Sequence, residues 1–153
     1  LYLLMYYFND LPNKEQAWND IVQIANNDYS LKSISISYLV RLFKYTPHKN
    51  KSWNDLVGLA QKGYGDEKKL TISLLGLVFK FAPDKDRAWN DLNAILKISD
   101  SNSQNFIACT LETSFEFVQN KDKAWDDLIQ LTGNGYKEYQ KIIAENLIPH
   151  YQI

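Results

Sequence analysis

This chain of 153 residues has one cysteine, almost no excess of either charge and no long apolar run. Its single cysteine, Cys109, cannot form an internal disulfide, which suits a reducing compartment, and we therefore expect a cytoplasmic protein. Seventeen basic residues nearly balance eighteen acidic ones, whereas proteins that bind polyphosphate usually carry a clear basic excess. No stretch approaches the roughly 18 consecutive apolar residues of a membrane span, so we expect no membrane insertion.

Motifs for catalysis and for metal or phosphate binding are also missing. No G-x-G-x-x-G, P-loop or G-x-S-x-G pattern occurs, and the paired glycines at 63–65 and 133–135 stand in predicted turns. The two histidines, His48 and His150, are far apart and belong to no metal-ligand spacing. The sequence therefore predicts a protein without metal or cofactor that is not an enzyme.

What the chain has instead is an internal repeat. Every tryptophan lies in one of the tetrapeptides AWND, SWND, AWND and AWDD, and the tryptophans are spaced by 35, 36 and 36 residues. Such periods are typical of solenoids and arrays. The repeated residues are the tryptophans Trp18, Trp53, Trp89 and Trp125, the aspartates Asp20, Asp55, Asp91 and Asp127, and the lysines Lys14, Lys49, Lys85 and Lys121.

The residues around each tryptophan predict an amphipathic helix. Proline precedes three of the tryptophans by six residues and cannot continue an earlier helix, and an Asn or Asp before the repeated lysine is a favoured N-cap in three copies. Tryptophan shares an apolar stripe with residues three, six and seven positions later. We therefore expect helices, named A helices, at about 14–26, 50–62, 85–98 and 121–132.

A second apolar pattern follows each A helix and predicts a B helix. A leucine recurs in every copy with an aromatic residue four positions later, as in Leu39 and Phe43. The run SISISYLV alternates like a strand, but the equivalent segments KLTISLLG and NFIACTLE fit helical spacing better. The expected B helices are 30–45, 66–81, 102–118 and 136–148.

The first ten residues fit the same pattern. Leu4 and Phe8 occupy the columns of Leu39 and Phe43, so LYLLMYYF is predicted to be the second half of a B helix and not a signal peptide, which would need a basic start and a cleavage site. Because the chain opens at Leu1, we expect a processed product or a fragment of a longer chain, with further repeats or domains covering this helix.

The segment APDKDRAWNDL at 82–92, preceded by LLGLVFKF at 74–81, resembles a HEAT-like repeat family of the pattern P-D-K-x-x-A-W-x-D-L. The resemblance covers nearly the whole chain, although the family's V-R dipeptide is replaced in every repeat. It implies an all-α fold, a right-handed α-solenoid of about four helical hairpins in one domain, 1–153. Its units would be a partial B helix at 1–10 and repeats at about 12–46, 47–82, 83–118 and 119–153.

Two interpretations of the repeated residues are open from sequence. The tryptophans could form an aromatic platform on which bases stack, or they could fill the seam between A and B helices, which their apolar neighbours favour. The lysines could line up as phosphate ligands, or their methylenes could cover the indole while the ammonium reaches solvent or the ring face. For the aspartates we expect a ladder across adjacent A helices, accepting from a neighbouring repeat's backbone or lysine.

If the tetrapeptide is structural, function must lie in columns that vary. Repeats of this kind resemble protein-binding scaffolds, whose concave surface is lined by B helices. Here the candidate protein-binding residues are Lys32, Arg41, Lys44, Lys68, Lys69, Lys80 and Glu116. The sequence therefore predicts a non-catalytic scaffold for a protein partner with an extended acidic segment. The alternatives are a nucleic-acid-binding HEAT-like module, which the charge balance does not favour, and a structural or sensor segment of a larger signalling protein.

Overall fold

The computed structural model describes residues 1–133 together with residues 141 and 145. In this part of the chain the regular structure is entirely helical, as predicted, with eight α-helices and two short 3-10 helices. The segment SISISYLV lies in a helix, so the repeat and not the local alternation gave the right prediction. The fourth B helix, expected at 136–148, lies outside the described residues.

The A helices begin and end within one residue of the predicted positions. They are α2 (Lys14–Asn27), α4 (Lys49–Lys62), α6 (Lys85–Lys97) and α8 (Lys121–Gly133). Side chains cap three of them as predicted, because Asn13, Asp84 and Asn120 accept hydrogen bonds from backbone N–H groups three residues later. His48 precedes α4 without a side-chain cap and instead lies 3.3 Å from a carboxylate oxygen of Glu15.

The B helices are shorter than predicted. They are α1 (Tyr2–Tyr7), α3 (Lys32–Leu42), α5 (Gly65–Phe79) and α7 (Ser101–Phe115). The first two continue into 3-10 turns, η1 (Phe8–Asp10) and η2 (Phe43–Tyr45). Phe8 is buried like Phe43 and Phe79, the residues of the same sequence column in the next two repeats.

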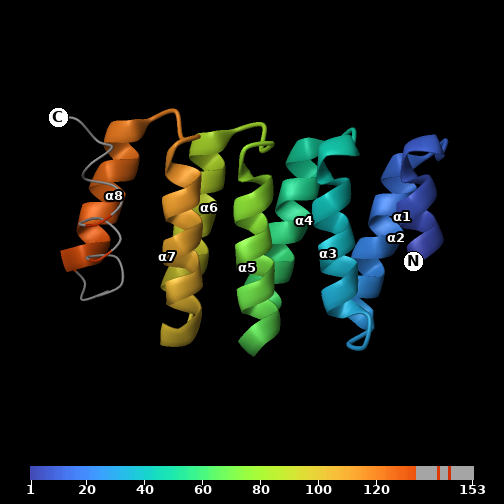
Figure 1. Ribbon diagram of the computed structural model, residues 1–153, viewed down its shortest axis with the longest axis horizontal. Coiled ribbons are helices and arrows are strands. Elements are labelled where there is room, and N and C mark those ends of the chain that lie inside the picture. The colour runs from blue at the N-terminus through green and yellow to red at the C-terminus, as the bar shows by residue number, and fades with distance from the viewer. Residues whose placement is uncertain (134–140, 142–144, 146–153) are drawn as a thin grey trace.

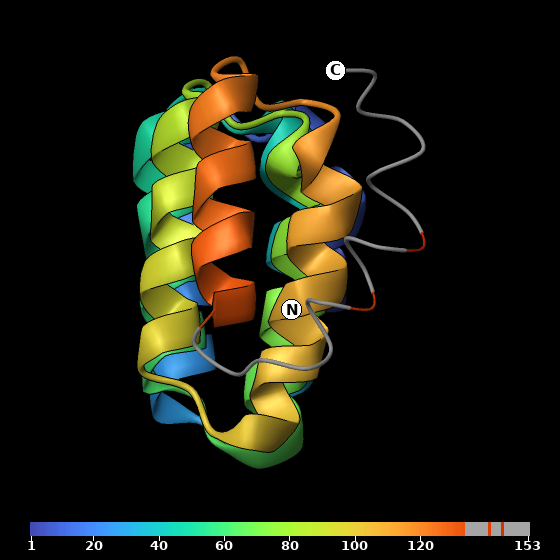
Figure 2. The same ribbon diagram turned by 90° about the vertical axis from the view of Figure 1, so that its left-hand side faces the viewer.

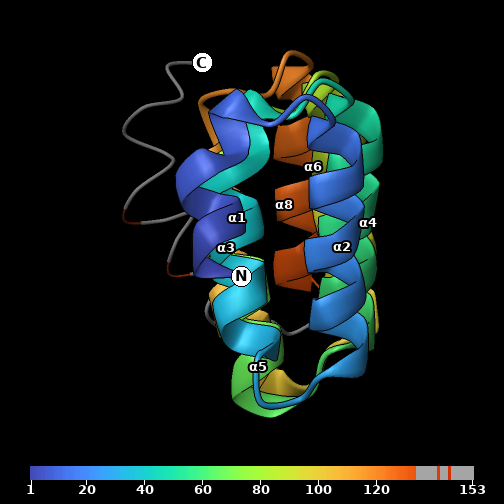
Figure 3. The same ribbon diagram turned by 90° about the vertical axis from the view of Figure 1, so that its right-hand side faces the viewer.

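The helices pack in two layers. Figure 1 shows α1, α3, α5 and α7 in front and α2, α4, α6 and α8 behind, with α1 and α8 at opposite ends of the long axis. The end-on views separate the two layers clearly (Figures 2 and 3), and successive helices run in opposite directions. Within the front layer, α5 contacts α3 and α7 more extensively than α4 contacts α2 and α6 in the rear layer.

The core lies between the layers and contains the tryptophans. Trp18 and Trp89 are 1% exposed and Trp53 is 3% exposed, while Trp125 is partly buried against the same core. Phe43 from the front layer contacts both Trp18 and Trp53 edge to face, with ring centroids 6.3 and 6.4 Å apart. Phe115 makes the same pair of contacts with Trp89 and Trp125. The indoles therefore join the repeats and are not an open stacking platform.

Each tetrapeptide is also bonded to the next one. The indole N–H groups of Trp18, Trp53 and Trp89 donate to Asp55, Asp91 and Asp127, at 2.8, 2.8 and 3.0 Å. The asparagine after the tryptophan accepts from a cation of the following A helix, in the pairs Asn19–Lys51, Asn54–Arg87 and Asn90–Lys123, each at 2.6 Å. Tryptophan, asparagine and aspartate thus form one repeated junction along the rear layer.

The structure corrects the predicted partners of two repeated residues. The aspartate ladder exists, but its donor from the neighbouring repeat is the indole and not a backbone group or lysine. The ammonium of Lys49 donates to the carbonyl oxygens of Lys44 and Thr46 at the end of the preceding B segment. Lys85 and Lys121 likewise donate to the carbonyls of Ala82 and Phe115. A cation is favourable where helix carbonyls lack intrahelical partners, which explains a lysine that opposes the dipole of its own helix.

Candidate functional site

The seven candidate binding residues do not form one surface. Lys32 and Lys69 lie near the beginning of α3 and α5, and both are engaged, Lys32 with Glu67 at 2.8 Å and Lys69 with Asp66 at 3.1 Å. Lys68 is 6% exposed, so the prediction that it adds charge to an open groove is wrong. Helix periodicity turns it inward, whereas the side chain of Lys69, one position later, is partly exposed.

The other candidates gather near the opposite end of the same helices. Arg41 and Lys44 line a hollow of about 450 Å³ between α3 and α5. Its remaining wall is apolar and includes Leu77, Tyr45 and Phe81, and Leu77 is 64% exposed. The ammonium of Lys44 lies 4.6 Å from the centre of the Tyr45 ring. We name this hollow, with its basic rim and apolar wall, hollow one.

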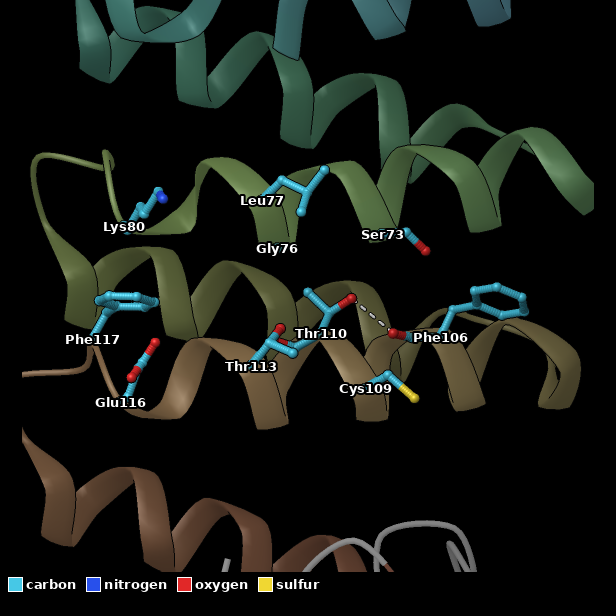
Figure 4. A pocket seen from close by; sticks show the side chains of 10 residues that line it. All are labelled: Ser73, Gly76, Leu77, Lys80, Phe106, Cys109, Thr110, Thr113, Glu116 and Phe117. Carbon is cyan, nitrogen blue, oxygen red and sulfur yellow. Dashed lines mark hydrogen bonds between the residues drawn. The ribbon is translucent and has the colours of Figure 1, made fainter. Parts of the chain in front are cut away.

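A second hollow, hollow two, lies between α5 and α7 and has a volume of about 420 Å³. In Figure 4, Ser73, Gly76, Leu77 and Lys80 come from α5, and the facing side chains come from the α7 segment. Those facing residues are Phe106, Cys109, Thr110, Thr113, Glu116 and Phe117. Leu77 lines both hollows and lies between them.

The two hollows are the same feature of successive repeats. Five residues of hollow one have counterparts 36 positions later that line hollow two. The pairs are Val40 and Gly76, Arg41 and Leu77, Lys44 and Lys80, Leu77 and Thr113, and Phe81 and Phe117. The cation over an aromatic ring also recurs, because the ammonium of Lys80 lies 5.1 Å from the centre of the Phe81 ring. The repeat thus places equivalent hollows side by side.

The charge of the two hollows differs. Arg41 of hollow one is replaced by Leu77 in hollow two, and the exposed carboxylate of Glu116 joins Lys80 there. Burial lowers the pKa of Lys121, and the negative charge of Glu116 opposes this shift, so the two groups interact electrostatically. Hollow one is therefore basic, whereas hollow two combines an apolar wall with balanced charge.

The apolar lining, which includes Leu77, was not among the candidate residues. A signal was available in the aromatic column Tyr45, Phe81 and Phe117, which recurs every 36 residues just past the buried phenylalanines. Sequence could not show that these rings line a surface, because an aromatic residue at a helix end packs inward as readily as outward.

Among the described residues there is no group of three or more His, Cys, Asp or Glu side chains that could hold a metal ion, and no helix there is long and apolar enough to cross a membrane. Comparison with known proteins gives no relative, since no family model, no curated protein and no solved structure matches the chain.

Proposed function

We propose that this chain is a non-catalytic HEAT-like α-solenoid that binds another protein through its front layer. The support for the solenoid is the junction of Trp, Asn and Asp that recurs, about every 36 residues, between the successive helices α2, α4, α6 and α8. The front-layer helices contact one another more extensively than the rear-layer helices do, which is the arrangement of a stack curved with its front layer inside. The single cysteine fits a cytoplasmic setting.

The observation that carries the binding function is the exposure of Leu77 between two hollows rimmed by cations. Leu77, which is 64% exposed, and the partly exposed side chains of Tyr45 and Phe81 together form an apolar surface patch. Patches of this composition with a polar rim mark interaction sites. The basic rim formed by Arg41, Lys44 and Lys80 suits a partner with an acidic segment, for which it would raise the association rate and the specificity.

Site-specific photocrosslinking tests this proposal. A benzoyl-phenylalanine is placed at Leu77, and the matched control carries it at the exposed Ala94 of rear-layer helix α6. In cells expressing the chain we expect a discrete crosslinked protein from position 77 and none of that mass from position 94. Crosslinks that are the same from both positions, or absent from position 77, would refute binding through the front layer.

A charge-reversal variant adds a second criterion. Arg41, Lys44 and Lys80 are changed to glutamate together, and Lys97, exposed on α6, is changed to glutamate in the control. We expect the crosslink at position 77 to disappear in the triple variant and to persist in the control. A crosslink to nucleic acid instead of protein, with a steep dependence on salt, would support the nucleic-acid alternative.

A further inference from the structure

The repetition of the hollows limits the geometry of what can bind there, provided that the proposed protein-binding function holds. Hollow one and hollow two use equivalent columns of neighbouring repeats, so a ligand that spans both meets two hollows at equivalent positions. The distance between equivalent points is the separation of neighbouring packed helices, which is about 8–10 Å. A segment that fills both hollows needs two side chains on one side at that distance.

Backbone conformation decides which residues can meet this spacing. In a polyproline II helix the rise is about 3.1 Å per residue with three residues per turn, so residues i and i+3 lie on one side about 9 Å apart. In a β-strand, side chains on one face are about 6.8 Å apart at i+2 and about 13 Å apart at i+4. Only the polyproline spacing agrees with the separation of the helices.

The lining also suits this conformation. Tyr45, Phe81 and Phe117 supply an aromatic row at the repeat spacing, with rings from both hollows. Grooves lined with aromatic residues are the usual surface for polyproline II segments. Ser73, exposed in hollow two, offers a hydroxyl group for one of the backbone carbonyls that a polyproline II segment leaves without internal partners.

The lining of each hollow favours a different type of ligand side chain. Arg41 and Lys44 rim hollow one, where a carboxylate would be bound by two cations. Leu77 and Phe106 line hollow two, which therefore suits a large apolar side chain. We propose that the front layer binds an extended, proline-rich segment in polyproline II conformation, with an acidic residue in hollow one and a large apolar residue three positions away in hollow two.

The test uses fluorescein-labelled synthetic peptides of equal length and composition that differ only in the positions of two residues. Each has a proline background, one glutamate and one leucine, offset by two, three or four positions and made in both orders. Binding to the full chain is measured by fluorescence anisotropy. We expect an offset of three to bind about fivefold or more tightly than offsets of two and four, the loss expected when one side-chain contact is misplaced.

Variants identify the two hollows. Arg41→Glu with Lys44→Glu should reverse the preference, so that a peptide with lysine in place of glutamate binds better than the original. Phe106→Ala should weaken the peptide with leucine but leave a peptide with alanine at that position unchanged. The matched controls are Lys97→Glu and Ile98→Ala, two exposed side chains at the end of α6, and neither should change the affinities.

The outcomes separate this inference from the function on which it rests. Equal affinity for all offsets, or no binding by any peptide, would overturn the polyproline geometry even if the photocrosslink at Leu77 succeeds. A preference for an offset of two would overturn it in favour of a β-strand ligand. Failure of the crosslink at Leu77 would refute the front layer as the binding surface, whatever the peptides show.

Discussion

The indole Nε1 of Trp53 donates a hydrogen bond to Oδ2 of Asp91 across a distance of 2.8 Å, from one A helix to the next. The ring itself is 3% exposed and contacts Phe79 edge to face. One side chain thus fills the core between layers and forms a polar bond between repeats. The contributions of the buried ring and of the hydrogen bond to stability should therefore be measurable separately.

Asp91→Ala should destabilise the protein by about 1–3 kcal/mol, because the largely buried indole N–H of Trp53 loses its acceptor. The matched control is Asp20→Ala in the same repeat column. Asp20 accepts from the exposed side chain of Gln16 and from no indole in the described residues, so its loss should cost less than about 0.5 kcal/mol. Urea unfolding measures both, and equal losses would show that the indole bond contributes nothing.

The bond between Trp18 and Asp55 should show coupling in a double-mutant cycle. Trp18→Phe removes the donor while keeping an aromatic ring, and Asp55→Ala removes the acceptor. We expect an interaction energy of about 1 kcal/mol, since Asp55→Ala leaves the buried indole N–H without its acceptor, whereas after Trp18→Phe the carboxylate still accepts from Lys51. Trp18→Phe with Asp20→Ala should be additive in the same unfolding assay, because Trp18 donates to Asp55 and Asp20 accepts from Gln16.

Lys49→Met should destabilise the protein by about 1–2 kcal/mol, although it removes a cation whose pKa is lowered by burial. The carbonyl oxygens of Lys44 and Thr46 would lose their charged donor at the end of the B segment. Lys14→Met is the control, since Lys14 occupies the same column and forms no such bond in the described residues. Thermal unfolding of the two variants measures the change in melting temperature that each causes. Equal changes would contradict the capping role of Lys49.

Gly76→Ala should destabilise the packing of α5 on α7 by about 1 kcal/mol. The added Cβ would lie 3.2 Å from Cγ2 of Thr110, and that side chain is held by a hydrogen bond to the carbonyl of Phe106 (Figure 4) at 2.7 Å. Thr110→Ser keeps the hydroxyl and removes the methyl group. In that background Gly76→Ala should become neutral or stabilising by about 0.5–1 kcal/mol, because alanine is the better helix former.

Acid should weaken the cap of α7. The backbone N–H of Ser103 donates to Asp100 and holds the pKa of this carboxyl below its ordinary value of 3.8. A lowered pKa in the folded state means that the stabilisation is complete above the unfolded value and is lost as the pH falls through the folded value. Asp100→Asn keeps an acceptor that does not titrate. The difference in unfolding free energy between the two proteins should therefore shrink as the pH falls below about 4, and a difference that stays constant there would contradict this.

Much of the fold was predictable because it repeats. A single copy such as SISISYLV is ambiguous between strand and helix, but its three equivalents resolve the ambiguity. Helix ends were predicted well where proline and an Asn or Asp cap stand together, as before α2 and α6, and less well for B helices, of which α1 and α3 end in 3-10 turns.

The site was predicted only in part. Arg41, Lys44, Lys80 and Glu116 are exposed on the B helices as expected. Lys68 was predicted to be exposed but is buried. Successive side chains on a helix differ in direction by about 100°, so an error of one position is enough to mistake a core position for a surface one. The apolar lining of the hollows was missed because exposure of Leu77 depends on how closely α3, α5 and α7 approach one another.

The sequence by itself determined the helical pairs and the burial of the tryptophans, since periodic apolar residues can be buried only on one face of each helix. Tertiary structure alone decided the partners across repeats. The bond from Trp53 to Asp91, the donation by Lys49 to the preceding B segment and the two equivalent hollows depend on the relative placement of helices. A local pattern carries no information on that placement, because it records which face of a helix is apolar and not which neighbour the face meets.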